Sequence, residues 1–440
     1  MYKELPMTTI LDFISNLTIE TIPKPALRTA RLCLLDAIGC MVCGMNYPPL
    51  LAMAGTIAEA NPGSSAIVAT PFSSTRAWAA FINTHAGAYF DLDDGHRKAQ
   101  GHPGGVIVPL SLMLAAENGC NGGELLAAIV AGYETAVRSA LILRRQGGPR
   151  KGSGAWSITG GAAAAGKLCN LSKPQLRNSL GLAEYYAPQA PQDRSLAGPS
   201  SMKEGMAWAS YTALTAVELA AAGFDAMDPF LLDASQCNDL GRNWEICSVY
   251  FKMYACCRFA HPLLDGLSEL IKKIEITPDS IESITVQSFA KALLLRRTAP
   301  ESPVAAMYSI PYAIGCKLIK GKVGPEEMRA ESLSNRQILD IAEKVTIEED
   351  PELTAVFPEK CLARVVLCLK DGTLIKSETL SAKGDPDNPY SRQQLRLKFL
   401  RLTQSLPDRR NEEMFDLIMN IEHENPRHLW QMLQKRSYRR

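Results

Sequence analysis

The stretch Pro25-Ala-Leu-Arg-Thr-Ala-Arg-Leu-Cys-Leu-Leu-Asp-Ala-Ile38 sets the expected fold, because its apolar residues recur at helical spacing behind a proline. Proline suits the first turn of a helix, and the spacing places the apolar side chains on one face. The same pattern continues to Gly223, which predicts a mainly α protein built from packed helices. Further helices are expected at residues 77–90, 106–117, 124–143, 157–169 and 211–222.

One of these segments is rich in small residues. Residues 157–169 contain Gly160, Gly161 and four successive alanines. Small side chains allow neighbouring helix backbones to approach closely, so we interpret them as the sign of a crowded helical interior rather than of catalysis.

The pattern changes near Lys272, where β-branched residues become frequent. Residues 281–288 and 344–348 have strand composition, and residues 364–376 place Asp-Gly between two apolar runs, which is a strong hairpin signal. Helical patterning resumes at Arg392, after a link rich in glycine and proline. We therefore predict a large all-helical domain formed by both chain ends, residues 1–268 and 389–440, with a smaller α+β lid domain, residues 269–388, inserted between them.

Length and charge limit the possible partners. A chain of 440 residues is expected to form two or three domains. Its 47 Lys and Arg residues nearly balance its 46 Asp and Glu residues. No basic excess is available to hold a phosphate backbone, so we expect no nucleic-acid partner.

Cysteine usage and the N-terminus indicate the compartment. Among the twelve cysteines, Cys40 and Cys43 form a CxxC motif, but no second pair completes a zinc site, so reduced buried thiols are expected. Residues 1–6 lack the features of a signal peptide, and we expect no apolar run of the roughly 18 residues that a membrane span needs. These observations predict a soluble cytoplasmic protein without a membrane partner.

Ionisable residues are concentrated in Asp91-Leu-Asp-Asp-Gly-His-Arg-Lys-Ala-Gln-Gly-His-Pro-Gly-Gly105, which holds three carboxylates and two of the six histidines. Because it follows a predicted helix, we expect its side chains at a helix end that faces a cavity, and we seek function there first. Two other interpretations stay open. In one, Asp91 and Asp94 cap or turn the chain while His102 is a hydrogen-bonded interior residue. In the other, the Asp and His side chains bind a metal ion.

Four motifs in a fixed order carry a family resemblance. They are Asn83 with Asp91-Leu-Asp-Asp94 and Gly101-His-Pro-Gly104; Met202-Lys-Glu-Gly205; Tyr250-Phe-Lys-Met-Tyr-Ala-Cys-Cys-Arg-Phe-Ala-His-Pro262; and Tyr308-Ser-Ile-Pro-Tyr312. With these motifs, residues 8–400 resemble the MmgE/PrpD family. The resemblance implies a homodimer whose active site lies in the cleft between the helical and lid domains. It also implies small di- or tricarboxylate substrates, no organic cofactor and, for most members, no metal.

The resemblance also assigns roles to particular side chains. Asp91 would orient or polarise a group and His102 would move a proton, a task that suits a side chain whose ordinary pKa lies near neutrality. Lys203 matches the lysine before the second motif's helix, although a solvated first-turn lysine is the plain alternative. A lysine is unfavourable at a helix N-terminus, and a bound carboxylate would relieve that conflict.

The third and fourth motifs supply further candidates. Lys252, Arg258 and His261 are expected to bind substrate carboxylates, although Arg258 pairing with a structural carboxylate is the alternative. Tyr312 matches the lid tyrosine that closes on the site, whereas Tyr308 is expected only to pack.

This chain departs from the family pattern at two places. Gly95 stands where the dehydratases and decarboxylases of the family have threonine, so a hydroxyl contact is missing, and the imidazole of His96 is a candidate to replace it. Lys151 stands where relatives have a second active-site histidine. An inward Lys151 would add positive charge to the pocket, and an outward one would leave the proton-transfer role of that histidine vacant.

The resemblance implies chemistry that places negative charge on the carbon next to a carboxylate. Its barrier falls if fixed cations hold the carboxylate while a nearby group moves a proton. The leading hypothesis is a cofactor-independent lyase, either a dehydratase or hydratase of a hydroxy-polycarboxylate or a decarboxylase. An epimerase of an iminodisuccinate-like dicarboxylate is the enzymatic alternative. A non-catalytic carboxylate-binding protein and a metal-dependent hydrolase are the alternatives from other classes.

Overall fold

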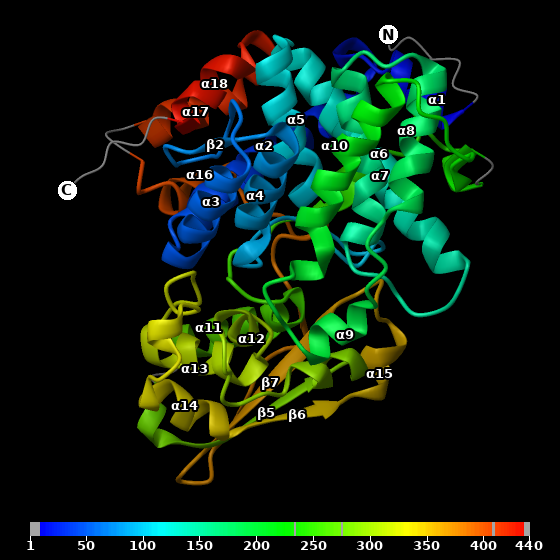
Figure 1. Cartoon of the computed structure of the whole chain (residues 1–440). Helices are drawn as coiled ribbons and strands as arrows, with labels where there is room; N and C mark the ends of the chain where they lie inside the picture. The colour runs from blue at the N-terminus through cyan, green and yellow to red at the C-terminus, as the bar shows by residue number, and fades with distance from the viewer. Residues whose placement is uncertain (1–8, 233–234, 274–275, 407–409, 435–440) are drawn as a thin grey trace.

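The computed structural model describes residues 9–232, 235–273, 276–406 and 410–434, and helices dominate them (Figure 1). The prediction of a mainly α protein is confirmed. Residues 1–6, on which the expectation of no signal peptide rests, lie outside the described residues. The same holds for residues 435–440, at the end of the expected C-terminal helical segment.

Most helices pack around one apolar core, which both ends of the chain share. Buried residues from Ile10 to Phe251 and from Leu395 to Leu433 belong to it. The C-terminal helices, orange and red in Figure 1, pack against α2 and α5. The helices of this part are α1 (Ile10–Asn16), α2 (Lys24–Met45), α3 (Pro48–Ala60), α4 (Arg76–Tyr89), α5 (Gly104–Asn118), α6 (Gly122–Arg145), α7 (Gly154–Leu168), α8 (Lys173–Tyr185), α10 (Met206–Ala221), α16 (Arg392–Leu402), α17 (Arg410–Met419) and α18 (Pro426–Gln434).

The small residues of α7 have the packing role that the sequence predicts. A Cβ atom on Gly160 would lie 2.4 Å from the carbonyl oxygen of Gly132 in α6, so only glycine permits this approach. The five helices predicted individually are present as α4, α5, α6, α7 and α10, and each begins earlier than predicted. Helix starts are hard to place because the first turn has no apolar periodicity of its own.

Helix α6 corrects one expectation. It is long and apolar enough to cross a membrane, although the sequence had suggested no such run. Of its most apolar stretch, 94% is buried inside the molecule, which is the environment of a core helix. Its neighbours α5 and α7 pack along it.

A second apolar core surrounds a mixed sheet in the lower half of Figure 1. The strand order is β6-β5-β7-β8, with β9 also paired to β7; β5 and β6 are parallel, and the other pairs are antiparallel. The predicted hairpin is present, with Gly372 at φ 86° in the turn between β7 and β8. The elements are β5 (Ile281–Ser288), β6 (Val345–Glu349), β7 (Leu362–Leu369), β8 (Leu374–Lys376), β9 (Leu380–Ser381), α11 (His261–Lys273), α12 (Pro303–Met307), α13 (Ile310–Lys320), α14 (Arg336–Glu343) and α15 (Pro351–Ala355).

Short elements connect the two cores. Helix α9 (Gln192–Ala197) lies against the sheet-containing half, where Lys291 Nζ donates to Asp193 Oδ1 at 2.7 Å. Strands β3 (Gly95–His96) and β4 (Val249–Tyr250) pair antiparallel, and β1 (Ser65–Ala66) pairs with β2 (Ser73–Ser74). The β3–β4 pair thus holds the acidic motif beside the segment that leads into the second core. The domain boundaries at residues 268 and 388 stay predictions.

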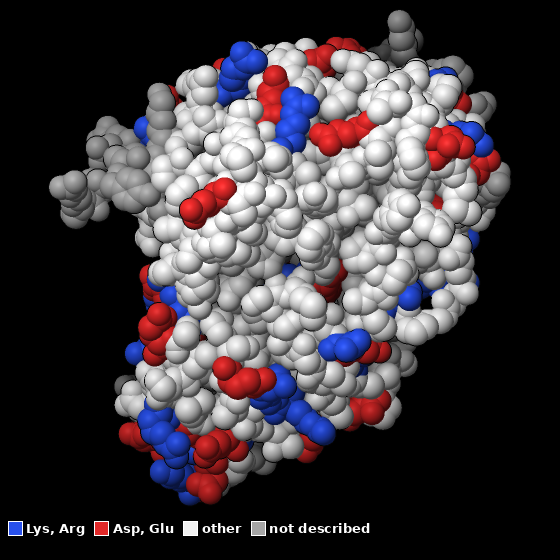
Figure 2. Space-filling view, viewed as in Figure 1, with Lys and Arg blue, Asp and Glu red and all other residues white. Residues whose placement is uncertain are grey.

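Surface charge and thiols agree with the composition. On the face drawn in Figure 2, Lys and Arg alternate with Asp and Glu over the sheet-containing half, and the helices present a mostly uncharged surface. All twelve cysteines lie in described residues and all are free; seven are buried. The expectation of buried thiols therefore holds for seven of the twelve, and the other five are partly exposed.

Candidate active site

Asp91 lies just beyond the C-terminal end of α4, in the left-handed conformation with φ 54°. Its carboxylate is buried and accepts three hydrogen bonds, from Lys203 Nζ at 2.9 Å, Lys252 Nζ at 2.6 Å and Tyr308 Oη at 3.2 Å. Burial alone would raise the pKa of Asp91, but the two ammonium groups outweigh it and hold that pKa well below its usual range. Asp91 is therefore ionised and too weak a base to remove a carbon-bound proton.

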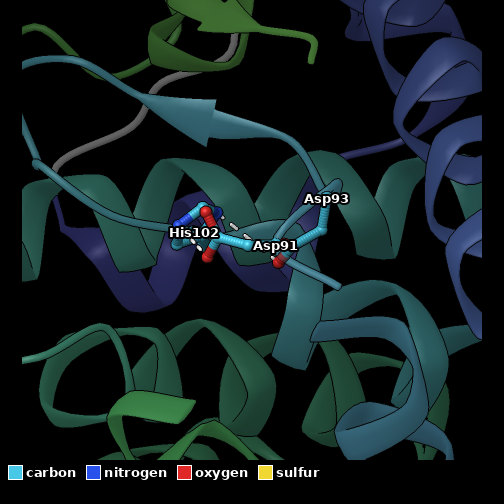
Figure 3. Close-up of side chains that lie close together, drawn as sticks. All are labelled: Asp91, Asp93 and His102. Atoms are coloured by element: carbon cyan, nitrogen blue, oxygen red, sulfur yellow. Dashed lines mark ion pairs between the residues drawn. The ribbon is translucent and has the colours of Figure 1, made fainter. Parts of the chain in front are cut away.

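His102 faces Asp91 from the start of α5. Its Nδ1 lies 2.8 Å from the carbonyl oxygen of Asp94, which accepts only if Nδ1 carries the proton. The other nitrogen, Nε2, then lies 3.9 Å from Asp91 Oδ1 with its lone pair available. Figure 3 shows the carboxylates of Asp91 and Asp93 converging on the imidazole. Neutral His102 is thus arranged as a general base.

Charge around His102 sets its protonation. Burial lowers the pKa of His102, and Lys252 lowers it further, but Asp93, Asp91 and Glu204 outweigh both and leave the pKa raised. Asp93 Oδ2 lies 3.5 Å from His102 Nδ1, and neither oxygen of Asp93 has a hydrogen-bond partner among the described residues. The imidazole is therefore held ready to take up a proton.

A chain of hydrogen bonds fixes the backbone of His102. Its N–H donates to Ser153 Oγ at 3.0 Å, and Ser153 Oγ donates to Glu204 Oε2 at 2.6 Å. Lys203, Glu204 and Gly205 all have positive φ, of 42°, 57° and 73°. Positive φ is unfavourable for lysine and glutamate, and strain of this kind concentrates at functional sites. The turn directs Lys203 towards Asp91 and Glu204 towards Ser153.

Asp94 is bonded to residues next to the site. Its Oδ2 accepts from Tyr133 Oη at 2.5 Å and its Oδ1 from the Gly104 backbone N–H at 3.1 Å. Burial, followed by the negative charge of Asp36, raises the pKa of Asp94 to about 7. The contacts of Asp94 are therefore consistent with a structural turn residue. Asp91 differs, because it is part of a charged cluster.

A cavity opens beside Asp91 and His102, between the helical and the sheet-containing halves. It holds about 610 Å³ of space not occupied by atoms, part of it open to solvent. The centre of a water-sized sphere can occupy about 60 Å³ of it, which makes it a narrow cavity. The polar residues that line it are Asp91, Arg97, Gln100, His102, Gln192, Glu204, Tyr250, Arg258 and Tyr308.

Two arginines on the cavity wall share one carboxylate. Arg258 Nη2 lies 2.9 Å from Asp385 Oδ1, and Arg97 forms an ion pair with the other oxygen of Asp385. Arg258 also donates to the carbonyl oxygens of Ala382 and Lys383, at 3.2 and 3.0 Å. The pairing with a structural carboxylate is thus present, but Arg258 still lines the cavity. Two guanidinium groups beside one carboxylate leave one positive charge uncompensated.

The structure brings together Asp91, His102, Lys203 and Lys252, as the resemblance implied. Lys203 and Lys252 do not line the cavity; both ammonium groups are bonded to Asp91. Direct substrate contact by either lysine therefore stays a prediction. Lys252 is fully buried, and the charge of Asp91 raises its pKa although burial lowers it, so it remains a cation.

Two predicted histidines lie elsewhere. His96 is fully buried, its Nε2 lies 3.3 Å from Glu245 Oε2, and its Nδ1 accepts from the Ala99 backbone N–H at 3.2 Å. Successive residues of a strand face opposite sides, and the side chain of His96 lies against Glu245 and does not line the cavity. His261 is also fully buried; burial holds its pKa well below the ordinary value, and its Nε2 lies 3.2 Å from the Cys256 carbonyl oxygen. Neither histidine lines the cavity, so contact of His96 or His261 with a substrate stays a prediction.

Lys151 and Tyr312 do not line the cavity either. Lys151 Nζ donates to the Gln189 carbonyl oxygen at 3.5 Å, so it adds no charge to the cavity wall. The hydroxyl of Tyr312 lies 3.0 Å from the carbonyl oxygens of Glu327 and Ser332. Tyr308, expected only to pack, lines the cavity and donates to Asp91. Tyr308 and Tyr312 are four positions apart, on either side of the break between α12 and α13, and sequence does not show which of the two faces the cavity.

Sequence reasoning missed Arg97, Gln100, Glu204 and Tyr250. Gln100 lines the cavity at φ 57°, and neither atom of its side-chain amide has a hydrogen-bond partner among the described residues. Arg97 and Gln100 lie inside the acidic motif, so a search of that motif for every polar residue would have found them. Glu204 directly follows Lys203. Tyr250 is the first residue of the third motif, but only the structure shows that it lies opposite Gly95 in the β3–β4 pair.

The metal interpretation rests on Asp91, Asp93 and His102, whose ligand atoms lie within 4.8 Å of one another. Two lysine ammonium groups already occupy both oxygens of Asp91. A divalent cation would have to displace them or lie beside them, where like charges repel. The geometry therefore fits a metal ion poorly.

Comparison with known proteins agrees with this architecture. The MmgE/PrpD N-terminal domain matches residues 8–236, and the MmgE/PrpD C-terminal domain matches residues 254–422. A cis-aconitate decarboxylase of Aspergillus terreus (strain NIH 2624 / FGSC A1156) is 22% identical over 94% of this chain and 92% of its own length. A cis-aconitate decarboxylase-like protein of Aspergillus oryzae is 25% identical over 91% and 90%. A mouse cis-aconitate decarboxylase is 24% identical over 88% and 84%.

Proposed function

The chain belongs to the MmgE/PrpD family, and on that premise we propose that it is a cofactor-independent lyase of a small di- or tricarboxylate. The reaction is dehydration or hydration, or decarboxylation, by proton transfer next to a carboxylate. The observation that carries the proposal is the convergence of Asp91, His102, Lys203 and Lys252 beside a cavity walled by arginines. The names of the decarboxylase relatives support this class of substrate and reaction.

Recognition of the substrate rests on the arginines of the cavity wall. Arg97 and Arg258 share Asp385, so this pair has one cation more than it has carboxylates. Lys203 and Lys252 share Asp91, but the charge of Asp93 also acts on Lys252. A guanidinium on the cavity wall binds a carboxylate with two parallel hydrogen bonds. We assign substrate binding to the arginine pair.

The chemical step is assigned to His102. Its neutral Nε2 removes the proton from the carbon next to the bound carboxylate, and the negative charge that develops is stabilised by the nearby lysine cations. Asp91 holds the two lysines and polarises the imidazole. Because the cations are fixed in a site shielded from water, they need no reorganisation during the reaction.

A substrate panel tests the proposal. Proton NMR in deuterated water follows wild type with citrate, cis-aconitate, malate and iminodisuccinate. A new olefin, or its hydration, indicates a dehydratase; released carbon dioxide indicates a decarboxylase. Exchange at the α carbon without an olefin would instead favour the epimerase. Carboxylate binding without any turnover would favour the non-catalytic alternative and contradict the proposal.

Two further parts of the proposal have their own tests. The homodimer that the resemblance implies is tested by light scattering coupled to size-exclusion chromatography, where a monomeric mass would contradict it. Independence from metal is tested by elemental analysis of purified, active protein. Stoichiometric metal, with loss of activity on chelation, would favour the metal-dependent hydrolase.

A further inference from the structure

Gly95 and Tyr250 face each other in the antiparallel β3–β4 pair. A Cβ atom on Gly95 would lie 2.3 Å from both Cζ and Oη of Tyr250. The phenol ring therefore occupies the space that any other residue at position 95 would fill. The extra imidazole of His96 does not enter this space, because it is paired with Glu245.

Tyr250 and His102 flank the same glycine. His96 pairs with Val249 on one side and forms an antiparallel bridge with Gly101 on the other. Continued by one residue, this register places Tyr250, Gly95 and His102 in a single row across the strands. Side chains in one row point to the same face, and both Tyr250 and His102 line the cavity. Glycine between them leaves no side chain to separate the phenol from the imidazole.

The hydroxyl of Tyr250 has no assigned task within the protein. Tyr250 is only 5% exposed, and its hydroxyl makes no hydrogen bond in the described part of the chain. The hydroxyl of Tyr308, by contrast, is bonded to Asp91. Tyr250 lines the cavity, and its hydroxyl oxygen is not one of the unpartnered polar atoms that are closed off from solvent, so a ligand in the cavity can reach it.

The surroundings of Tyr250 suit a proton donor. Burial raises the pKa of its phenol well above the ordinary value, so the group is protonated at neutral pH. The guanidinium carbon of Arg258 lies 4.5 Å from the ring centroid, where its positive charge stabilises a phenolate once the proton has left.

We propose that Tyr250 is a catalytic general acid that protonates the departing hydroxyl of a β-hydroxy polycarboxylate, an assignment that rests on the proposed lyase function and selects dehydration. His102 Nε2 takes the proton from the α carbon, and the electron pair of that bond forms the carbon–carbon double bond. The bond from the β carbon to the hydroxyl oxygen breaks, and the Oη–H proton of Tyr250 goes to that oxygen, which leaves as water. The imidazolium and phenolate then return to their neutral forms by transfer of one proton after the olefinic acid leaves.

A change of leaving group tests the assignment. Fluoride is a weak base and leaves without a proton, whereas hydroxide does not. The substrates are malate and citrate and the matched acids in which fluorine replaces the hydroxyl; olefin is followed by absorbance and fluoride by an ion-selective electrode. We expect Tyr250→Phe to slow loss of water by ~10²–10⁴-fold, the usual contribution of a general acid, and to leave loss of fluoride within about threefold of wild type.

Tyr254→Phe is the matched control, because its hydroxyl lies on the same segment but is bonded to Asp265 at 2.9 Å, away from the residues that line the cavity. Both eliminations should be unchanged in that variant. Equal slowing of both eliminations in Tyr250→Phe, or slowing of neither, overturns the role of Tyr250 and leaves the lyase function in place. A wild-type protein that decarboxylates but eliminates neither group overturns only the choice of dehydration and the role of Tyr250. No reaction of any panel member with wild type refutes the proposed function as well.

Discussion

Lys252 Nζ lies 2.6 Å from Asp91 Oδ2, although 161 positions separate the two residues in the chain. With Lys203 on the other oxygen, one buried carboxylate balances two buried cations. A buried ion pair contributes little over an apolar pair of the same shape, but removal of one partner leaves an uncompensated charge. The cluster therefore makes the stability of the fold depend on Asp91.

Asp91→Asn should lower the free energy of unfolding by about 3–5 kcal/mol, because two ammonium groups lose their counter-charge. Denaturant unfolding measures the change, with the exposed Asp279→Asn as control. In the double variant Asp91→Asn/Lys252→Met, one of the orphaned cations is gone, so the loss should be smaller than the sum of the two single losses. Strictly additive losses would show that the two side chains do not interact.

The pKa of Asp94 predicts a dependence of stability on pH. The folded-state pKa of about 7 lies above the ordinary value of 3.8 for the unfolded chain, so the stability that this group contributes is fully present below 3.8 and is lost as the pH rises through about 7. Asp94→Asn should remove this loss, so its melting temperature should exceed that of wild type by more at pH ~8 than at pH ~5. An equal difference at both pH values would contradict the raised pKa.

The pH profile of catalysis should report His102. A general base must be neutral, and the pKa of His102 is raised by Asp93, Asp91 and Glu204 against the lowering effect of burial. We therefore expect kcat/KM for α-proton removal to increase with pH through a midpoint above about 6.5, the ordinary value for histidine. The exposed His428→Ala should keep the same profile. A midpoint below the ordinary value would mean that burial, not the carboxylates, dominates.

Tyr308 and Tyr312, which are four positions apart, offer a matched comparison. Tyr308→Phe removes a hydrogen bond to Asp91 and should reduce kcat by ~10–100-fold, since a bond to a charged group contributes about 1.5–3 kcal/mol. Tyr312→Phe removes bonds to backbone carbonyls outside the cavity and should reduce thermal stability while it leaves kcat within about twofold. Steady-state kinetics and melting curves of both variants check this. A fall in kcat in Tyr312→Phe, with kcat preserved in Tyr308→Phe, would show that Tyr312 and not Tyr308 acts at the site.

Arg97 should contribute to substrate binding more than to the chemical step. Arg97→Met removes one of the two guanidinium groups on the cavity wall, so KM for a polycarboxylate should increase by about 10–100-fold, with a smaller change in kcat. Arg97→Lys keeps the charge but not the forked geometry and should give an intermediate KM. A fall in kcat at constant KM would show that Arg97 acts on the transition state alone.

Much of the fold follows from local pattern. The β5 strand has the predicted bounds, and the Asp-Gly signal locates the β7–β8 turn, because both depend on residues close together in the chain. Helix α6 shows the limit of this reasoning. Its composition passes the test for a membrane span, and only tertiary packing shows that neighbouring helices surround it.

The sequence predicted which charged motif residues meet at the site. It did not predict the direction in which the other side chains point. Asp91, His102, Lys203 and Lys252 meet as the resemblance implied. His96 was misplaced because adjacent strand residues face opposite ways, and the register of a two-residue strand is set by its pairing with β4. The sequence analysis gave the site role to Tyr312 and the packing role to Tyr308, because only the packing of their segment shows which hydroxyl reaches Asp91. Lys203 and Lys252 were expected to contact the substrate, but both are bonded to Asp91. The spacing of the motifs does not reveal this pairing.

The most direct test of the central claim is the rate at which the α proton of a bound polycarboxylate is removed, measured by NMR in deuterated water for wild type and His102→Ala. The account predicts turnover or exchange by wild type and a loss of at least ~10²-fold in the variant, with binding of the acid, followed by calorimetry, kept within about tenfold. A folded His102→Ala protein that removes the proton as fast as wild type would contradict the account.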